Sequence, residues 1–116
     1  MHLHGHNFWV LAEGNGVWDG KIVNENNPIR RDTQLLLPGT EENPGYLVLE
    51  FETDNPGVWP LHCHIAWHSA GGMYLNIIEH PEKLKLMKAP TPVVETCRGW
   101  WNYTGHETVN QIDSGV

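Results

Sequence analysis

The tripeptide His62-Cys63-His64 constrains this chain more than any other feature, because it puts three metal-binding side chains on consecutive residues. Successive side chains of an extended strand point to opposite faces, so both imidazoles would lie on one face and the Cys63 thiolate on the other. One strand could therefore serve two metal sites. The tripeptide thus favours a β-rich fold in which metal ligands lie at or near the ends of strands.

On the thiolate side, the spacing Cys-x4-His-x4-Met supplies Cys63, His68 and Met73. A thiolate, imidazoles and a weak axial thioether are the ligand types of a blue-copper site. A second imidazole is still missing from this set. A plainer interpretation of Met73 is that it only fills a gap in the core, as flexible methionines do.

On the opposite face, His62 and His64 need partner ligands. The first residues of the chain offer His2 and His4, which are also two positions apart and would share one face of a strand. Together these four imidazoles would form half of a copper cluster.

Other interpretations remain open. A single His-x-His pair is common on exposed strands that bind no metal. Zinc also binds Cys and His, but structural zinc sites usually recruit paired cysteines, and this segment contains only Cys63. A non-catalytic blue-copper electron carrier would need only Cys63, His68, Met73 and one more histidine. It would leave His2, His4, His62 and His64 without a role. The joint presence of all these motifs in one short chain favours redox copper.

These motifs resemble those of the multicopper oxidases, and among them the laccases of filamentous ascomycete fungi. Their last two copper signatures read His-Pro-x-His-Leu-His-Gly-His and His-Cys-His-Ile-x-Trp-His. The second is complete in residues 62–68, and the first begins at its third position with Met1. Ala66 also matches the ascomycete subgroup better than the basidiomycete one, which tends to carry an acid there.

The resemblance implies roles for the histidines. It implies that His2 binds the type 2 copper and that the type 3 pair is bound by His4, His62 and His64. His6 matches a family position that is not a ligand, so we expect it to be structural.

The resemblance also implies a type 1 copper bound by Cys63 and His68, with Met73 in the axial position. Electrons would enter from substrate at His68 and pass through Cys63 to the adjacent histidines. Laccases of high potential have Leu or Phe at the axial position, which cannot coordinate. A thioether favours the oxidised metal, so Met73 predicts a potential toward the low end.

The function implied is that of a secreted laccase, which removes single electrons from phenols or aromatic amines and reduces O2 to water with four coppers. Bilirubin oxidases and ferroxidases would share every ligand seen here and are the alternative. The trinuclear cluster of the family uses eight histidines, of which this chain offers four. We therefore expect a fragment that is inactive alone and needs the remaining cupredoxin domains, and Met1 is expected to be internal to a longer protein.

The fold implied is all-β: part of a cupredoxin-like Greek-key β-sandwich with a short helical C-terminal tail. It would be the latter half of a third cupredoxin domain, with the copper-binding part in residues 1–80 and the tail in residues 81–116. Because strands would be missing, we expect Phe8, Val48 and Phe51 to lose part of their covering.

Features of the tail also match the resembling laccases. A C-terminal cysteine like Cys97 forms a disulfide to the first domain in those proteins, which suits a secreted, oxidising setting, although a buried free thiol is the alternative. Asn102-Tyr103-Thr104 is a glycosylation sequon. Residues 113–116 resemble an ending that enters the channel to the trinuclear cluster, but a frayed tail is equally consistent with them.

Charge excludes several partners. The chain has 7 basic and 14 acidic residues, so it lacks the basic surface that nucleic acids or anionic membranes would need. Apolar runs are only a few residues long, which is too short for a transmembrane helix.

Strands are expected at residues 6–12, 46–53 and 71–78, which are rich in β-formers. Turns are expected at residues 14–16 and 54–57, and a long loop should reach Gly39, interrupted by the apolar Leu35, Leu36 and Leu37. Short helices are expected at residues 82–88 and 93–101.

Overall fold

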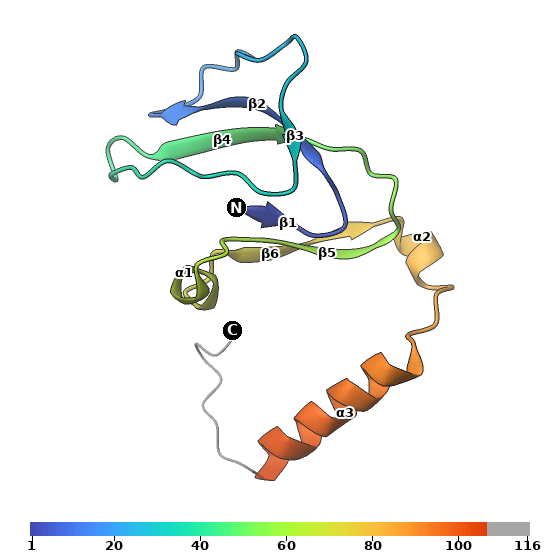
Figure 1. Cartoon of the computed structure of the whole chain (residues 1–116). Helices are drawn as coiled ribbons and strands as arrows, with labels where there is room; N and C mark the ends of the chain where they lie inside the picture. The colour runs from blue at the N-terminus through green and yellow to red at the C-terminus, as the bar shows by residue number, and fades with distance from the viewer. Residues whose placement is uncertain (107–116) are drawn as a thin grey trace.

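The computed structural model describes residues 1–106 and consists of two antiparallel sheets, a short helix between two strands, and a helical C-terminal segment (Figure 1). The first sheet has the strand order β1-β5-β6, formed by β1 (His2–Leu3), β5 (Gly57–His62) and β6 (Tyr74–Glu79). The second sheet has the order β3-β2-β4, formed by β3 (Arg30–Arg31), β2 (Phe8–Asn15) and β4 (Gly45–Glu50). The predicted all-β architecture with a helical C-terminal segment is confirmed.

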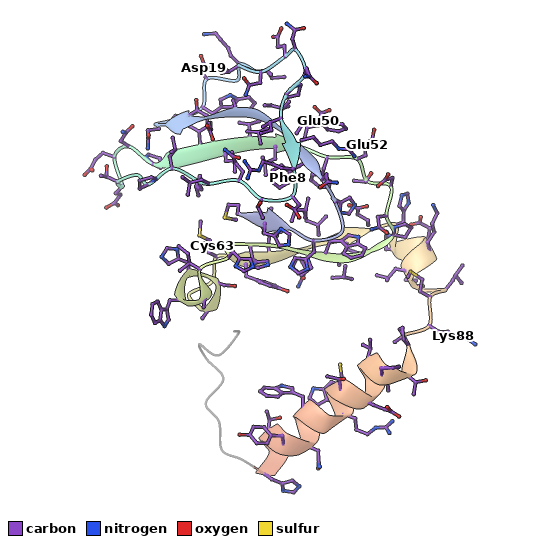
Figure 2. All side chains as sticks on the ribbon, viewed as in Figure 1. Phe8, Asp19, Glu50, Glu52, Cys63 and Lys88 are labelled. Atoms are coloured by element: carbon purple, nitrogen blue, oxygen red, sulfur yellow. The ribbon has the colours of Figure 1, made fainter. Side chains whose placement is uncertain are left out.

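The core lies between the two sheets. On β2 the buried side chains alternate along the strand, as expected for a strand with one face inward, and they are Phe8, Val10 and Ala12. Leu3 of β1 packs against the first two of these from the other sheet. Phe8 is fully buried (Figure 2), so the expectation that it loses covering was wrong; the two sheets present here already enclose it. Val48 and Phe51 are half-buried.

The pairing of β2 with β4 corrects the predicted turn. Asn15 pairs with Gly45, so both Gly14 and Asn15 belong to the strand rather than to a turn. The chain reverses one residue later at Gly16, whose φ is 93°. Backbone pairing with β4 extended the strand past glycines that, read locally, indicate a turn.

The third predicted strand begins later than expected. Gly71 and Gly72 end the short helix α1 (Ala66–Ala70), because their N–H groups donate to the carbonyls of Trp67 and Ser69. The left-handed φ of 107° at Gly72 then allows the chain to leave the helix and start β6 at Tyr74.

The helices of the C-terminal segment differ in length from the prediction. α2 (Pro81–Leu84) is shorter than the expected residues 82–88, whereas α3 (Thr91–His106) is longer than residues 93–101 and has no buried side chain. Figure 1 shows α3 extending away from both sheets. No helix within residues 1–106 is both long and apolar enough to cross a membrane.

Candidate metal centre

Strand pairing brings the two histidine-bearing segments together. In the antiparallel register of β1 and β5, His2 lies opposite His62 and Leu3 opposite Leu61. The backbone N–H of His4 then donates to the carbonyl of Pro60 at 2.9 Å, which continues the pairing past the end of β1. The predicted copper motif at His2 and His4 therefore lies beside the one that begins at His62, on the same sheet.

Four imidazoles form a cluster at this edge of the first sheet, and they belong to His2, His4, His62 and His64. The ring centroids of His2 and His4 are 4.7 Å apart, and those of His4 and His62 are 5.1 Å apart. His64 completes the group, with its centroid 5.9 Å from that of His62 and 6.1 Å from that of His2. All four histidines predicted for the cluster thus lie together.

Backbone carbonyls set the tautomers of two of these rings. Nδ1 of His2 contacts the carbonyl oxygen of Asp32 at 2.8 Å, and Nδ1 of His62 contacts that of Cys63 at 2.9 Å. A carbonyl only accepts, so each Nδ1 carries the hydrogen and each neutral ring presents a lone pair at Nε2. An imidazole that donates its other N–H to a carbonyl in this way is oriented as a metal ligand.

The surroundings of His4 lower the pKa of its ring. Burial, followed by the charges of His2, His62 and His64, lowers the pKa of His4 below its ordinary value of 6.5. Its Nε2 lies 2.9 Å from Nε2 of His62. Because a metal competes with protons for imidazole, a lowered pKa keeps this ring available as a ligand at lower pH.

The thiolate-side residues also meet. Cys63 directly follows β5 and lies beside α1 (Figure 2), and its Sγ is 3.5 Å from Nδ1 of His68. The N–H of Cys63 donates to the carbonyl of Met73 at 3.0 Å, and the N–H of Met73 donates to the carbonyl of His68, also at 3.0 Å. The three predicted type 1 ligands are therefore linked through the backbone.

A hollow of about 570 Å³ adjoins these three residues. Part of its wall is formed by Leu35, Leu36 and Leu37. The sequence showed this run only as an apolar interruption of a polar loop. That unusual composition was the available signal for a loop that lines a site.

Glu79 is a further residue that sequence reasoning missed. It is the last residue of β6 and is buried, with its Oε1 3.1 Å from Nε2 of His6. A charged residue at the end of a strand usually faces solvent, so nothing in the local sequence marked it. His6, expected to be structural, is buried as well.

The imidazole and cysteine side chains of this chain fit copper, but they form only parts of copper sites. Within residues 1–106, no three His, Cys, Asp or Glu side chains are grouped so that they could hold a metal ion by themselves. They converge instead in pairs, His4 with His62 and Cys63 with His68. Imidazole lone pairs and a thiolate are the ligands that copper sites use, so each pair fits a site completed by further ligands.

The predicted features of the tail stay predictions. Cys97 is exposed on α3, and neither it nor Cys63 forms a disulfide in the part of the chain that the structure describes. The sequon at Asn102 lies within α3, where the Thr104 hydroxyl donates to the carbonyl of Trp100 at 3.1 Å. Residues 113–116 lie outside the described residues, and the division at residue 80 is not tested.

Comparison with known proteins supplies the family. Residues 1–83 match the sequence model of the family described as multicopper oxidase. The whole chain aligns with a laccase of Arthroderma benhamiae at 41% identity and with Laccase-1 of Botryotinia fuckeliana at 39%, covering 20% of each relative. The crystal structure of a laccase from Botrytis aclada superposes with a TM-score of 0.73 at 34% identity, over 99% of this chain and 21% of that one. The chain thus spans about a fifth of the length of the proteins it resembles.

Proposed function

Because this chain belongs to the multicopper oxidase family, we propose that it supplies part of both copper centres of a laccase, which oxidises phenols or aromatic amines and reduces O2 to water. The relatives and the solved structure are laccases, and they align over nearly the whole chain. The remaining ligands and the substrate pocket would come from other cupredoxin domains of the same protein.

A single observation carries the proposal: Cys63 is flanked in the chain by His62 and His64, whose imidazoles lie in the histidine cluster. Cys63 contacts His68 on one side, while the neighbouring His62 contacts His4 on the other. A backbone step spans about 3.8 Å, so the path from sulfur to either imidazole is on the order of 10 Å. Copper, when bound, would supply the one-electron redox steps at the two ends of this path.

The positions of these residues suit different roles in electron transfer and metal binding. His68 is exposed and contacts the Cys63 sulfur, so it suits the entry of electrons from a substrate at the surface. Cys63 would conduct them inward. His2 and His62, each fixed by a carbonyl at Nδ1, would bind metal through Nε2.

We also propose that the protein is secreted. The support is the exposed Cys97, which suits a disulfide to another domain, together with the sequon at Asn102. Mass spectrometry of protein recovered from the culture medium should find a disulfide at Cys97 and a glycan at Asn102, and absence of the protein from the medium would contradict secretion.

The experiment uses the natural protein that contains this chain, loaded with copper. We expect a blue protein that consumes O2 with a simple phenol, and we expect Cys63→Ser to lose both the colour and the turnover. Cys97→Ser, the matched change at the other cysteine, should keep the blue colour of each folded molecule, even though it removes the proposed disulfide. Colour that persists in Cys63→Ser would contradict the proposal. Faster turnover with ferrous ion or bilirubin than with phenols would instead indicate a ferroxidase or a bilirubin oxidase.

A further inference from the structure

His6 and Glu79 are the two buried polar residues in the described part of the chain, and they contact each other. Their side chains are 3% and 2% exposed, and Nε2 of His6 lies 3.1 Å from Oε1 of Glu79. The contact is close but not aligned as a hydrogen bond, since neither that nitrogen nor either carboxylate oxygen has a hydrogen-bond partner among residues 1–106. Two polar side chains buried in this way without a hydrogen bond are costly compared with apolar side chains of similar volume.

The other nitrogen of His6 reaches a predicted copper ligand. Nδ1 of His6 lies 3.0 Å from the carbonyl oxygen of His4, so this nitrogen carries the hydrogen and donates it. The backbone N–H of His4 donates to Pro60. Both polar groups of the His4 backbone are therefore held, one by β5 and the other by His6.

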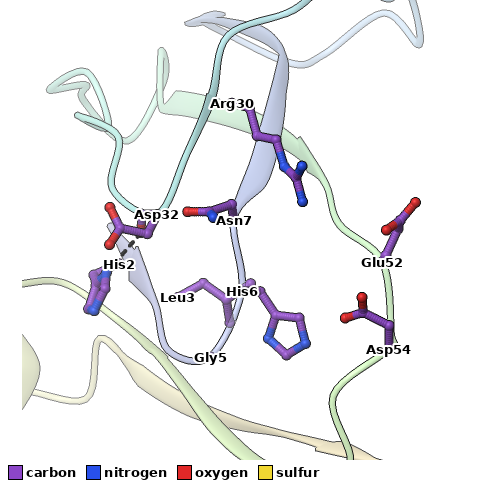
Figure 3. Close-up of a pocket in the computed structure, with 9 residues that line it drawn as sticks. All are labelled: His2, Leu3, Gly5, His6, Asn7, Arg30, Asp32, Glu52 and Asp54. Atoms are coloured by element: carbon purple, nitrogen blue, oxygen red, sulfur yellow. Dashed lines mark hydrogen bonds between the residues drawn. The ribbon is translucent and has the colours of Figure 1, made fainter.

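The surroundings fix the His6 ring in place. It packs against Phe51, with ring centroids 5.5 Å apart, and against Trp59 at 5.7 Å. Figure 3 shows the ring projecting from the turn at Gly5 on the side away from His2. Glu79 pairs with Gly57 in the register of β5 and β6, so the contact ties the turn to the far strand of the first sheet.

We propose that His6 and Glu79 are positioning residues for the copper cluster. Glu79 holds the His6 ring, His6 holds the carbonyl of His4, and the His4 imidazole is thereby aimed at His62. The inference rests on the proposed function in one respect, which is that His4 is a copper ligand. It adds two residues to that site which do not themselves bind metal.

The test compares variants of the copper-loaded natural protein by two readings: copper retained per molecule after dialysis, and the blue absorbance from Cys63. Residues that orient a ligand typically change metal affinity about 10–100-fold when replaced. We therefore expect Glu79→Leu to lose copper from the histidine cluster while the blue absorbance is kept. Glu79→Gln should restore copper, because its amide N–H can donate to Nε2 of His6 while Nδ1 of His6 still donates to the His4 carbonyl.

The chain offers a matched control in its other His–Glu pair. Nδ1 of His80 also lies 3.1 Å from Oε1 of Glu82, but this pair is on the surface. Glu82→Leu should leave both readings unchanged.

A double variant separates positioning from folding. His6→Phe with Glu79→Leu replaces the whole buried polar pair with apolar side chains, so thermal stability should return to near that of the wild type. The His4 carbonyl would still lack its donor, and copper retention should stay low. Equal loss of copper and blue absorbance in Glu79→Leu, or full copper retention in the double variant, would overturn the proposal.

A copper-free measurement keeps the two proposals distinguishable. If the wild-type protein takes up no copper, the proposed function fails, but crystal structures without metal still test the pair. The Nε2 atoms of His4 and His62 are 2.9 Å apart in the wild type. Glu79→Leu should widen this separation, and an unchanged separation would refute the positioning role.

Discussion

Nε2 of His4 lies 2.9 Å from Nε2 of His62, although 58 positions separate the two residues in the chain. Because Nδ1 of His62 donates to the Cys63 carbonyl, its Nε2 accepts, and the hydrogen between the rings belongs to Nε2 of His4. A metal bound there would need the His4 lone pair instead. Copper binding is thus expected to move this hydrogen from Nε2 to Nδ1 of His4.

The first prediction concerns pH. In the copper-free protein His4 should titrate below its ordinary pKa of 6.5, since burial and the neighbouring histidines lower the pKa. Between the lowered value and 6.5 the unfolded chain binds more protons than the folded one, so stability falls as pH drops through this window. An NMR titration of the His4 ring checks this, and a midpoint at or above 6.5 would contradict it.

The second prediction concerns the axial position. Met73→Leu in the copper-loaded natural protein should raise the potential of the blue site, because a leucine cannot donate to the metal. Redox titration of the blue absorbance measures the shift. Met87→Leu, at an exposed methionine far along the chain, is the control and should change nothing. An unchanged or lowered potential in Met73→Leu would mean that Met73 is not the axial group.

The third prediction concerns the turn at Gly5. This glycine has φ of 72°, and a Cβ added there would lie 2.6 Å from the Trp59 ring. Gly5→Ala should destabilise by about 1–2 kcal/mol from the left-handed backbone and by about 1–3 kcal/mol more from overpacking against Trp59.

Gly20 supplies the control for that change. Its φ is 87°, but a Cβ there meets nothing within 4 Å. Gly20→Ala should therefore show only the backbone cost. Urea denaturation of both variants measures the difference, and equal losses would show that Trp59 yields without cost.

The fourth prediction concerns residues 1–116 expressed alone. The first sheet leaves several apolar side chains exposed, including Val58 at 45%, Leu75 at 51% and Ile78 at 61%. The isolated chain should therefore self-associate, and with four histidines in its cluster it should not sustain O2 reduction. Size-exclusion chromatography and oxygen uptake with a phenol check both points. Sustained turnover by a monomer would show that the missing ligands are unnecessary.

The local sequence pattern predicted where strands form, but not which strands pair with each other. The alternating side chains of β2 and the β-formers of β4 were recognisable, because the chain itself sets the period of a strand. The opposition of His2 and His62 is a long-range register, which no local pattern encodes. The shared spacing of two suggested that the two segments contribute to one cluster, and the family resemblance implied the role of each histidine, but neither gave the register.

The rest of the differences have the same physical origin. Gly14 and Asn15 read locally as a turn, yet pairing with β4 kept them in a strand. Glu79 is buried against His6, which lies 73 positions earlier in the chain. The sequence around Glu79 therefore could not show that it is buried. Tertiary contacts decided both outcomes.

The backbone hydrogen bond from Cys63 to Met73 has a consequence for how such a protein could diversify. It fastens the two ends of the connecting segment to the sheet, so their spacing does not depend on what lies between them. Ile65 and Trp67, both exposed in that segment, can change without moving either end. Under the proposed function, the surface that would face a reductant could thus evolve separately from the backbone frame that would hold the metal.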